Sequence, residues 1–261
     1  MNHPLAGYFC VPHDCPPKWL FMFTAYVDET GHELERGWTF LAGFLGNEDQ
    51  WKNFVPEWRA GLGRQRKFLH MSSLRWNNDS TRRLLARLGP IPEECGLRPI
   101  MAGSRLEDYV DLVSDKPYEK QFKSYLVCLH VLVIQVLREI PDDETLEIVF
   151  EEQRQYEPWA NLILAIAARV GPKTSEGLPK LAKWSFVPKG STIMTDPSDY
   201  FASALAKIWG TEPRSKKAHW CYPILKSGNG IGYGKIMQRD EIRPIMTEIV
   251  NPLLDRLNVR S

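Results

Sequence analysis

The sequence predicts an α/β fold, because short apolar and aromatic runs alternate along the chain with longer segments of helical periodicity. The 261 residues suffice for one large domain or two small ones with a buried core. Hydrophobic residues make up 43% and charged residues 25%, and 33 basic against 32 acidic side chains leave a formal charge of +1. This is ordinary globular composition, and it excludes a chain that is mostly disordered.

The expected strands are apolar runs bounded by polar turns. Residues 20–27 are apolar throughout, which is typical of a strand buried on both faces, and the strand should end at Asp28. Residues 38–45 resume the pattern after a charged turn, so these two strands should form a hairpin. Residues 67–70 should be a short extended piece, and further strands are expected at 97–102, 145–150 and 182–187.

The expected helices follow from apolar spacing and from capping residues. Asn47 should cap a helix that keeps one apolar face from Trp51 to Leu62. The segment 117–140 is apolar around most of its circumference, so that helix should be central. Pro197 suits the first turn of another helix. The other expected helices are 80–88, 156–170, 196–209 and about 245–257.

A cytoplasmic protein is the expectation. The five cysteines, at positions 10, 15, 95, 128 and 221, are odd in number and scattered, which favours reduced thiols. Cys10 and Cys15 flank His13, but no second pair follows at zinc-ligand spacing, so a structural zinc site is a minor alternative. The longest apolar run, 124–137, is too short and too polar to span a bilayer. The first residues lack the pattern of a signal peptide.

Acidic residues stand where predicted strands end or a predicted helix begins. These acids are Asp28, Glu29, Glu151, Glu152 and Asp199. The carboxyl ends of the strands in an α/β sheet form the usual ligand crevice. Carboxylates that converge there repel one another, and a hard divalent cation such as Mg²⁺ normally neutralises them. Two such ions about 4 Å apart activate a water and stabilise the leaving oxygen in phosphodiester cleavage.

An ordinary structural role is the alternative for each acid taken singly. Acidic residues are common in strand-end loops and at helix N-termini, where Asp196 or Asp199 would favour the helix dipole and Ser198 would take part in capping. Their order along the chain favours a shared site.

The chain resembles a prokaryotic family over residues 20–208. The segments that carry the likeness are Tyr26-Val-Asp28-Glu29-Thr-Gly31, Phe40-Leu-Ala-Gly43-Phe, Trp51, Trp58 and Phe68-Leu-His70. Together they are similar to the opening of the family called domain of unknown function 3800, which usually has Ser where Thr30 stands. Ile148-Val-Phe-Glu151 matches its middle strand ending in an acid, and residues 198–205 loosely match its helical Ala-Asp dipeptide.

That family is similar in fold to ribonuclease H. The resemblance therefore implies a ribonuclease-H-like mixed sheet flanked by helices, with helical insertions. It also implies a carboxylate on the first strand, one ending the fourth and one on the last helix, which by position are Asp28, Glu151 and Asp199. His70 matches a family position and is a candidate ligand or proton shuttle, with a hydrogen-bonded structural histidine as the alternative.

The expected organisation is one main domain with two additions. Residues 1–19 form an N-terminal extension, and 20–209 form the ribonuclease-H-like domain with an insertion at about 47–96. Residues 210–261 hold a Gly-rich loop and a helix packed on the same domain. The glycines at 227–235 fail the spacing of a phosphate loop, so a flexible loop is expected there.

A nucleic acid, DNA or RNA, is the expected partner, and no membrane is expected. Since the whole chain is nearly neutral, contacts with phosphates should come from local basic patches and metal ions. The patches are Arg64-Gln-Arg66-Lys67, Arg82-Arg83 with Arg87, and Arg214-Ser-Lys216-Lys217. The oligomeric state does not follow from the sequence.

The leading hypothesis is a nuclease, a phosphodiesterase that depends on Mg²⁺ or Mn²⁺. Its catalytic residues would be Asp28, Glu151, Asp199 and His70, and its metal ligands Asp28, Glu29, Glu151, Glu152 and Asp199. The family match favours Glu151 over Glu152, a choice that strand alternation leaves open. The alternative is a catalytically degenerate module that binds nucleic acid or protein, because Glu151 stands where Asp is usual and Asp196-Pro197 replaces Leu-Gln. A nucleotide phosphohydrolase is a third hypothesis.

Overall fold

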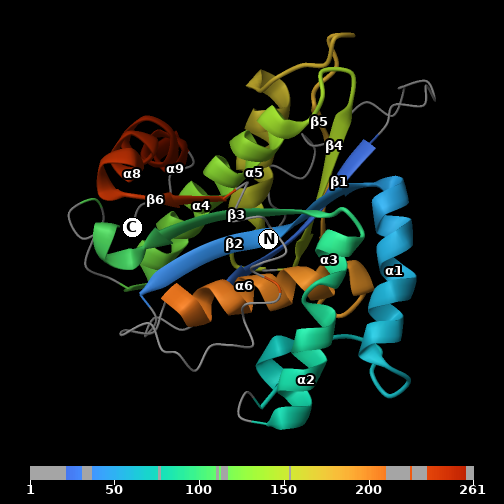
Figure 1. The fold of residues 1–261 in the computed structure, drawn as a ribbon. Helices are drawn as coiled ribbons and strands as arrows, with labels where there is room; N and C mark the ends of the chain where they lie inside the picture. The colour runs from blue at the N-terminus through green and yellow to red at the C-terminus, as the bar shows by residue number, and fades with distance from the viewer. Residues whose placement is uncertain are drawn as a thin grey trace, which may run out of the picture.

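A computed structural model describes residues 22–30, 37–75, 78–109, 112, 117–152, 154–209, 224 and 234–256. One six-stranded sheet is flanked by helices on both faces (Figure 1). The strands are β1 (Met22–Thr30), β2 (Trp38–Asn47), β3 (Arg98–Arg105), β4 (Thr145–Glu151), β5 (Leu181–Val187) and β6 (Gly234–Met237). The helices are α1 (Glu48–Leu62), α2 (Asp79–Leu88), α3 (Ile91–Glu94), α4 (Pro117–Glu139), α5 (Glu157–Val170), α6 (Asp196–Trp209), α8 (Arg239–Ile245) and α9 (Asn251–Arg256). Shorter turns are the 3-10 helices η2 (Met71–Ser73), η3 (Leu106–Tyr109) and η4 (Ile193–Thr195), and the π-helix η6 (Met246–Val250).

The sheet is mixed, with the strand order β5-β4-β1-β2-β3-β6. The pairs β1–β2 and β2–β3 are antiparallel, which confirms the predicted hairpin. The pairs β1–β4, β4–β5 and β3–β6 are parallel. Five strands therefore run in one direction and β2 alone runs against them, so β1, β4 and β5 end at the same edge of the sheet.

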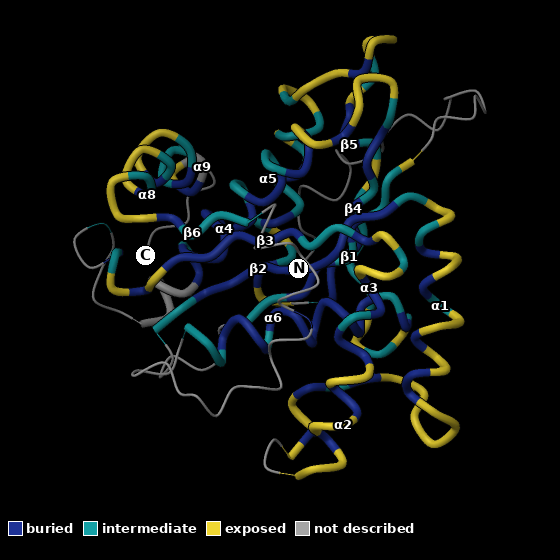
Figure 2. Tube along the Cα trace, in the orientation of Figure 1, coloured by how far each residue is buried: buried dark blue, intermediate teal, exposed yellow. Residues whose placement is uncertain are grey.

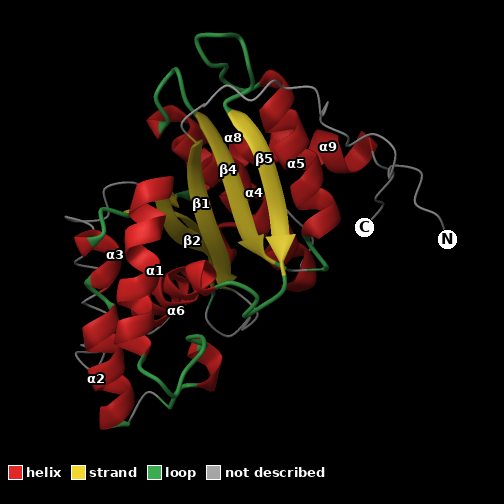
Figure 3. Cartoon of the chain, turned by 90° about the vertical axis from the view of Figure 1, so that its right-hand side faces the viewer, coloured by secondary structure: helices red, strands yellow, loops and turns green. Residues whose placement is uncertain are grey.

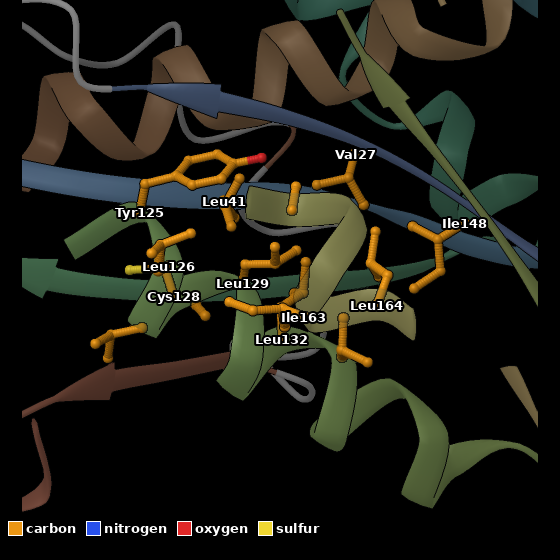
Figure 4. Close-up of a cluster of buried hydrophobic side chains, with 14 of the residues drawn as sticks. Val27, Leu41, Tyr125, Leu126, Cys128, Leu129, Leu132, Ile148, Ile163 and Leu164 are labelled. Atoms are coloured by element: carbon orange, nitrogen blue, oxygen red, sulfur yellow. The ribbon is translucent and has the colours of Figure 1, made fainter. Parts of the chain in front are cut away.

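The first face of the sheet is covered by α4, α5, α8 and α9. Strand β1 contributes Ala25 and Val27 to this core, and β4 contributes Ile148 and Phe150. Helices α4 and α5 lie side by side on this face, α4 against β2 and β3 and α5 against β5, and Figure 4 shows leucines of α4 near side chains of the strands. The prediction of a central helix is confirmed, because most of the residues between Tyr125 and Leu137 are buried.

The second face is covered by α6 and by α1, and α2 and α3 pack against α1 (Figure 3). Strand β2 sends Phe40, Ala42 and Phe44 into this core, and the ring of Phe44 lies 5.4 Å from that of Phe201 in α6. Figure 2 shows that β2, β3, β4 and α6 are mainly buried, whereas α1 and α2 expose their outer sides. The two opposed cores follow from the alternation of side chains along each strand.

The cap of α1 confirms the prediction for Asn47. Its side chain accepts a hydrogen bond from the backbone N–H of Gln50 at 2.9 Å, and the Gln50 side chain accepts one from the Asn47 N–H at 2.8 Å. This reciprocal pair satisfies two N–H groups that a helix start leaves without partners. Helix α1 therefore starts directly at the end of β2.

The structure corrects three of the predicted boundaries. Strand β1 does not end at Asp28 but runs to Thr30, because Asp28, Glu29 and Thr30 pair with Ala42, Leu41 and Phe40 of β2. The Gly-rich segment expected to be a loop enters a strand at Gly234, since residues 234–237 pair with β3. The last expected helix is divided into α8, η6 and α9. The first two differences depend on pairing with another strand, which local composition does not reveal.

Several predicted features lie outside the described residues. They are the 1–19 extension with Cys10, His13 and Cys15, the basic patch at 214–217 and most of the Gly-rich run at 227–233. None of the helices in the described ranges has both the length and the apolar content that crossing a bilayer requires.

Gly43 is the position where the sheet leaves no room for a side chain. It lies in β2 opposite Val27, and a Cβ added there would stand 1.9 Å from the carbonyl oxygen of Tyr26. We expect Gly43→Ala to lower the free energy of unfolding by about 3 kcal/mol, because β1 and β2 would have to move apart. Urea denaturation measures the change. The control is Gly177, a turn position with free space around it, where only the φ of 81° disfavours a side chain. Gly177→Ala should lower the free energy of unfolding by about 1 kcal/mol. A smaller loss for Gly43→Ala than for Gly177→Ala would contradict the close packing of β1 on β2.

Candidate functional site

Asp28 and Glu151 lie side by side on neighbouring parallel strands. Val27 of β1 pairs with Phe150 of β4, so the next residue of each strand is one of the two acids. Val27 and Phe150 face the α4 core. Because alternate residues of a strand point to opposite faces, both carboxylates point toward α6.

The first turn of α6 brings Asp199 to the same place. Helix α6 packs on β1 and β2, and the hydroxyl of Ser198 donates a hydrogen bond to the carbonyl oxygen of Tyr26 at 2.8 Å. Asp28, Glu151 and Asp199 are 5%, 6% and 8% exposed. We call these three residues the carboxylate cluster.

The members of the carboxylate cluster act on one another electrostatically. Burial, and then the charges of Glu151 and Asp199, raise the pKa of Asp28 well above its ordinary value. Lys189 and the backbone N–H of Glu29, which lies 2.8 Å from the Asp28 Oδ1 atom, act in the opposite direction. The site is therefore crowded with negative charge in a place from which water is largely excluded.

Lys189 supplies the cation of the carboxylate cluster. Its Nζ atom lies 2.8 Å from Glu151 Oε2, and its side chain is 48% exposed. Burial disfavours its charge, but Asp28, Glu151 and Asp199 together raise the pKa of Lys189 above its ordinary value. The sequence analysis missed this residue, although β5 ends at Val187 opposite Glu151 and the strand-end argument applied to the acids covers it equally.

His70 lies at the border of the carboxylate cluster. Its Nδ1 atom is 3.3 Å from Asp199 Oδ2, and its Nε2 atom is 2.9 Å from the hydroxyl oxygen of Ser72. The histidine side chain is 41% exposed. His70 therefore connects a buried carboxylate with solvent.

Asp196 holds the segment that carries His70. Its Oδ2 atom accepts hydrogen bonds from the Leu69 N–H at 2.7 Å and from the Trp58 indole N–H at 3.1 Å. Burial is the main reason that the pKa of Asp196 is raised to about 7, and these two donors oppose that rise. Sequence reasoning gave Asp196 only a helix-dipole role, because nothing local to it points to Trp58 or Leu69.

Glu29 and Glu152 are not brought into the carboxylate cluster. Glu29 follows Asp28 in β1 and therefore points to the opposite face. There, burial raises the pKa of the Tyr125 hydroxyl, and the charge of Glu29 raises it further. Glu152 forms an ion pair with Arg154, with 3.1 Å between Oε1 and Nε. The structure thus brings together four of the predicted site residues: Asp28, Glu151, Asp199 and His70.

The donors of the carboxylate cluster are oxygen atoms, with one imidazole nearby. Within the described ranges, no three His, Cys, Asp or Glu side chains lie close enough together, as they stand, to hold a metal ion. Lys189 contacts Glu151, and the Met71 N–H donates to Asp199 at 2.9 Å, so the acids are engaged by groups of the chain itself.

Comparison with known proteins gives no assignment for this chain. A scan against protein-family models finds no match. A search among curated proteins finds no relative either. The geometry and charges of the site are therefore the basis for inferring its function.

The hydrogen bonds of Asp196 predict a specific order of stability. We expect Asp196→Ala to lower the free energy of unfolding by about 3 kcal/mol, because two buried N–H groups would lose their acceptor. Asp196→Asn should lose much less, since its amide oxygen can accept both bonds. Denaturant unfolding of the two variants measures this, and equal losses would contradict the role of the hydrogen bonds.

The raised pKa of Asp196 predicts that the stability of the wild type depends on pH in a way that the stability of Asp196→Asn does not. The folded-state pKa of about 7 lies above the unfolded value of about 3.9. Unfolding therefore releases a proton between these values, so the contribution of Asp196 is present at low pH and is lost as pH rises toward 7. The stability of Asp196→Asn relative to the wild type should increase over that range, and a difference that is constant with pH would contradict a raised pKa.

Proposed function

We propose that this chain is a ribonuclease-H-like phosphodiesterase that cleaves DNA or RNA with Mg²⁺ or Mn²⁺ held by Asp28, Glu151 and Asp199. The observation that carries the proposal is the meeting of three buried carboxylates, from β1, β4 and α6, beside one lysine at the carboxyl edge of the sheet. That edge is where ligands bind in open α/β sheets.

The arrangement of the acids on the fold supports the proposal. The resemblance to the domain of unknown function 3800 implies acids on the first strand, at the end of the fourth and on a later helix. Asp28 lies on β1, Glu151 is the last residue of β4, and Asp199 lies in α6. The order β3-β2-β1-β4-β5, with only β2 reversed, is compatible with the mixed sheet that the same resemblance implies.

The donor atoms are of the kind that a divalent cation requires, and the three carboxylates would have to draw closer together to hold the ion. Three carboxylates stand against one cation, Lys189, so a divalent ion would offset the charge that the lysine leaves. Burial, and then the charges of Glu151 and Asp199, raise the pKa of Asp28 well above its ordinary value. Hard oxygen donors are the ligands that Mg²⁺ and Mn²⁺ prefer. The bound ion would supply an activated water and charge stabilisation at the phosphate.

The residues around the acids have separate tasks in this proposal. Lys189 orients Glu151 through the ion pair and, being half exposed, offers a positive charge to a phosphate oxygen. His70 orients Asp199 through Nδ1 and exchanges protons with solvent at the edge of the site. Asp196 is a positioning residue, because it fixes Leu69 next to His70.

One observation favours a second candidate, an interaction module without turnover. Lys189 Nζ already lies 2.8 Å from Glu151 Oε2 and offsets part of the charge that a metal would neutralise. In that case the lysine takes the place of the metal, and added Mg²⁺ or Mn²⁺ changes neither stability nor activity. Metal binding therefore separates the two candidates.

The first test is the thermal stability of the protein with and without Mn²⁺. A cation that binds only the folded state should raise the melting temperature, by about 5 °C at about 100 times its dissociation constant. Asp28→Asn should lose most of this shift because the amide lacks the charge that attracts the ion. The control is Glu152→Gln, which removes an acid paired with Arg154 and should keep the shift. Equal Mn²⁺ binding by the wild type and Asp28→Asn in calorimetry would count heavily against the metal site.

The second test compares the two adjacent acids at the end of β4. Glu151→Gln should lower metal-dependent cleavage of a labelled oligonucleotide by about 100-fold or more, since a neutral amide cannot hold a divalent ion against its hydration shell. Glu152→Gln should retain most of the activity, because its side chain pairs with Arg154. Circular dichroism checks the folding of both variants. The reverse ranking would mean that Glu152, and not Glu151, belongs to the site.

A further inference from the structure

A cavity of about 610 Å³ is lined by the segments that precede His70 and follow Lys189. Its volume lies within the range of about 300–1,000 Å³ that is typical of ligand sites. One wall comes from the end of α1 and the segment that follows it, and the other from the loop after β5. The residues that define its chemistry are Arg59, Arg66, Lys67, Phe68, Ser191 and Thr192. We call it the basic pocket.

The basic pocket is strongly positive. Three cationic side chains line it, and no acid is found among its described lining residues. Arg59, Arg66 and Lys67 are exposed, and within the described part of the chain none of them forms an ion pair. By contrast, Lys52 on the same helix α1 pairs with Glu48. Three unpaired cations around one cavity attract an anion with several phosphate oxygens.

Phe68 gives the basic pocket an aromatic surface. Its side chain belongs to the few large apolar residues that the described part of the chain exposes, with 38% of its surface accessible. An exposed aromatic ring beside unpaired cations is the combination with which proteins hold single-stranded nucleic acid, because bases stack on the ring while the cations follow the backbone. In a duplex the faces of the bases are already covered by their neighbours.

Both walls of the basic pocket continue directly into the candidate site. Phe68 is two residues from His70, and Ser191 is two residues from Lys189. Two residues span at most about 7 Å of chain. Even at the rise of a duplex, about 3.4 Å per nucleotide, two or three nucleotides cover this distance, and an extended single strand needs fewer. A strand with one phosphate at the carboxylate cluster therefore has neighbouring nucleotides within reach of the pocket.

We propose that the basic pocket binds the nucleotides next to the scissile phosphate of a single-stranded DNA or RNA. Arg59, Arg66 and Lys67 contact the phosphates, Phe68 stacks on a base, and the hydroxyl groups of Ser191 and Thr192 are available as donors. The inference rests on the proposed function and deepens it, because it names an unpaired strand as the substrate class and assigns the residues that hold it.

Fluorescence anisotropy with a labelled oligothymidylate of about 20 nucleotides tests this inference, with EDTA present so that no cleavage occurs. Arg66→Gln combined with Lys67→Gln should weaken binding at low salt by about tenfold or more. It should also reduce the slope of log affinity against log salt by about 1.4, because two phosphate contacts are lost. Phe68→Leu should weaken binding by about tenfold with little change in that slope, since it removes stacking and no charge.

The matched control is Arg138→Gln combined with Arg169→Gln. These arginines are exposed on α4 and α5, which cover the other face of the sheet, and the variant removes the same charge. It should bind within about twofold of the wild type, because phosphate contacts and not net charge determine the affinity. Equal weakening by this control would overturn the pocket assignment.

The remaining outcomes separate the inference from the proposed nuclease. If the wild type binds the strand through the pocket but does not cleave it with Mn²⁺, the inference holds and the proposed activity fails. If the wild type cleaves while the pocket variants bind and cleave equally well, the inference is overturned and the activity stands. Tighter binding of the matching duplex, or equally tight binding of a mononucleotide, also overturns the inference.

Discussion

The candidate site depends on the hydrogen bonds that residues in the first turn of α6 form with other parts of the chain. Asp196 accepts from the Trp58 indole and the Leu69 N–H, and Asp199 accepts from the Met71 N–H. Ser198 joins the same turn to β1. These bonds connect α1, the segment around His70, and the sheet, so that one helical turn positions parts of the chain that are far apart in sequence. Without these partners the burial of two carboxylates would be strongly unfavourable.

The carboxylate cluster is a local conflict between charge and burial. Asp28, Glu151 and Asp199 are nearly inaccessible, and Lys189 offsets only part of their charge. Elsewhere the fold follows the opposite rule, with apolar cores on both faces of the sheet. Proteins keep such unfavourable arrangements mainly where function requires them, which is why this place, and not the aromatic cores, carries the proposed activity.

The segment between β2 and β3 gives the site its surroundings. Helix α1 and the residues that follow it supply Trp58, which anchors Asp196, and also the cations and the phenylalanine of the basic pocket. The sheet and α6 alone would hold the acids but would lack the basic pocket, because α1 and the segment after it form one side of that cavity. The insertion therefore takes part both in placing the acids and in the proposed binding of a nucleic acid, because the backbone that carries Phe68 leads within two residues to His70.

Local sequence patterns determined the hairpin, the capped start of α1, the helix at 196–209 and the position of Glu151 at the end of β4, because each depends on neighbouring residues and on periodicity. Tertiary structure decided which side chains meet. Strand register placed Asp28 beside Glu151 and turned Glu29 to the other face, and the loop after β5 brought Lys189 to Glu151. Pairing with a distant strand also made residues 234–237 a strand. Such contacts depend on register and packing across the whole chain, which no local pattern contains.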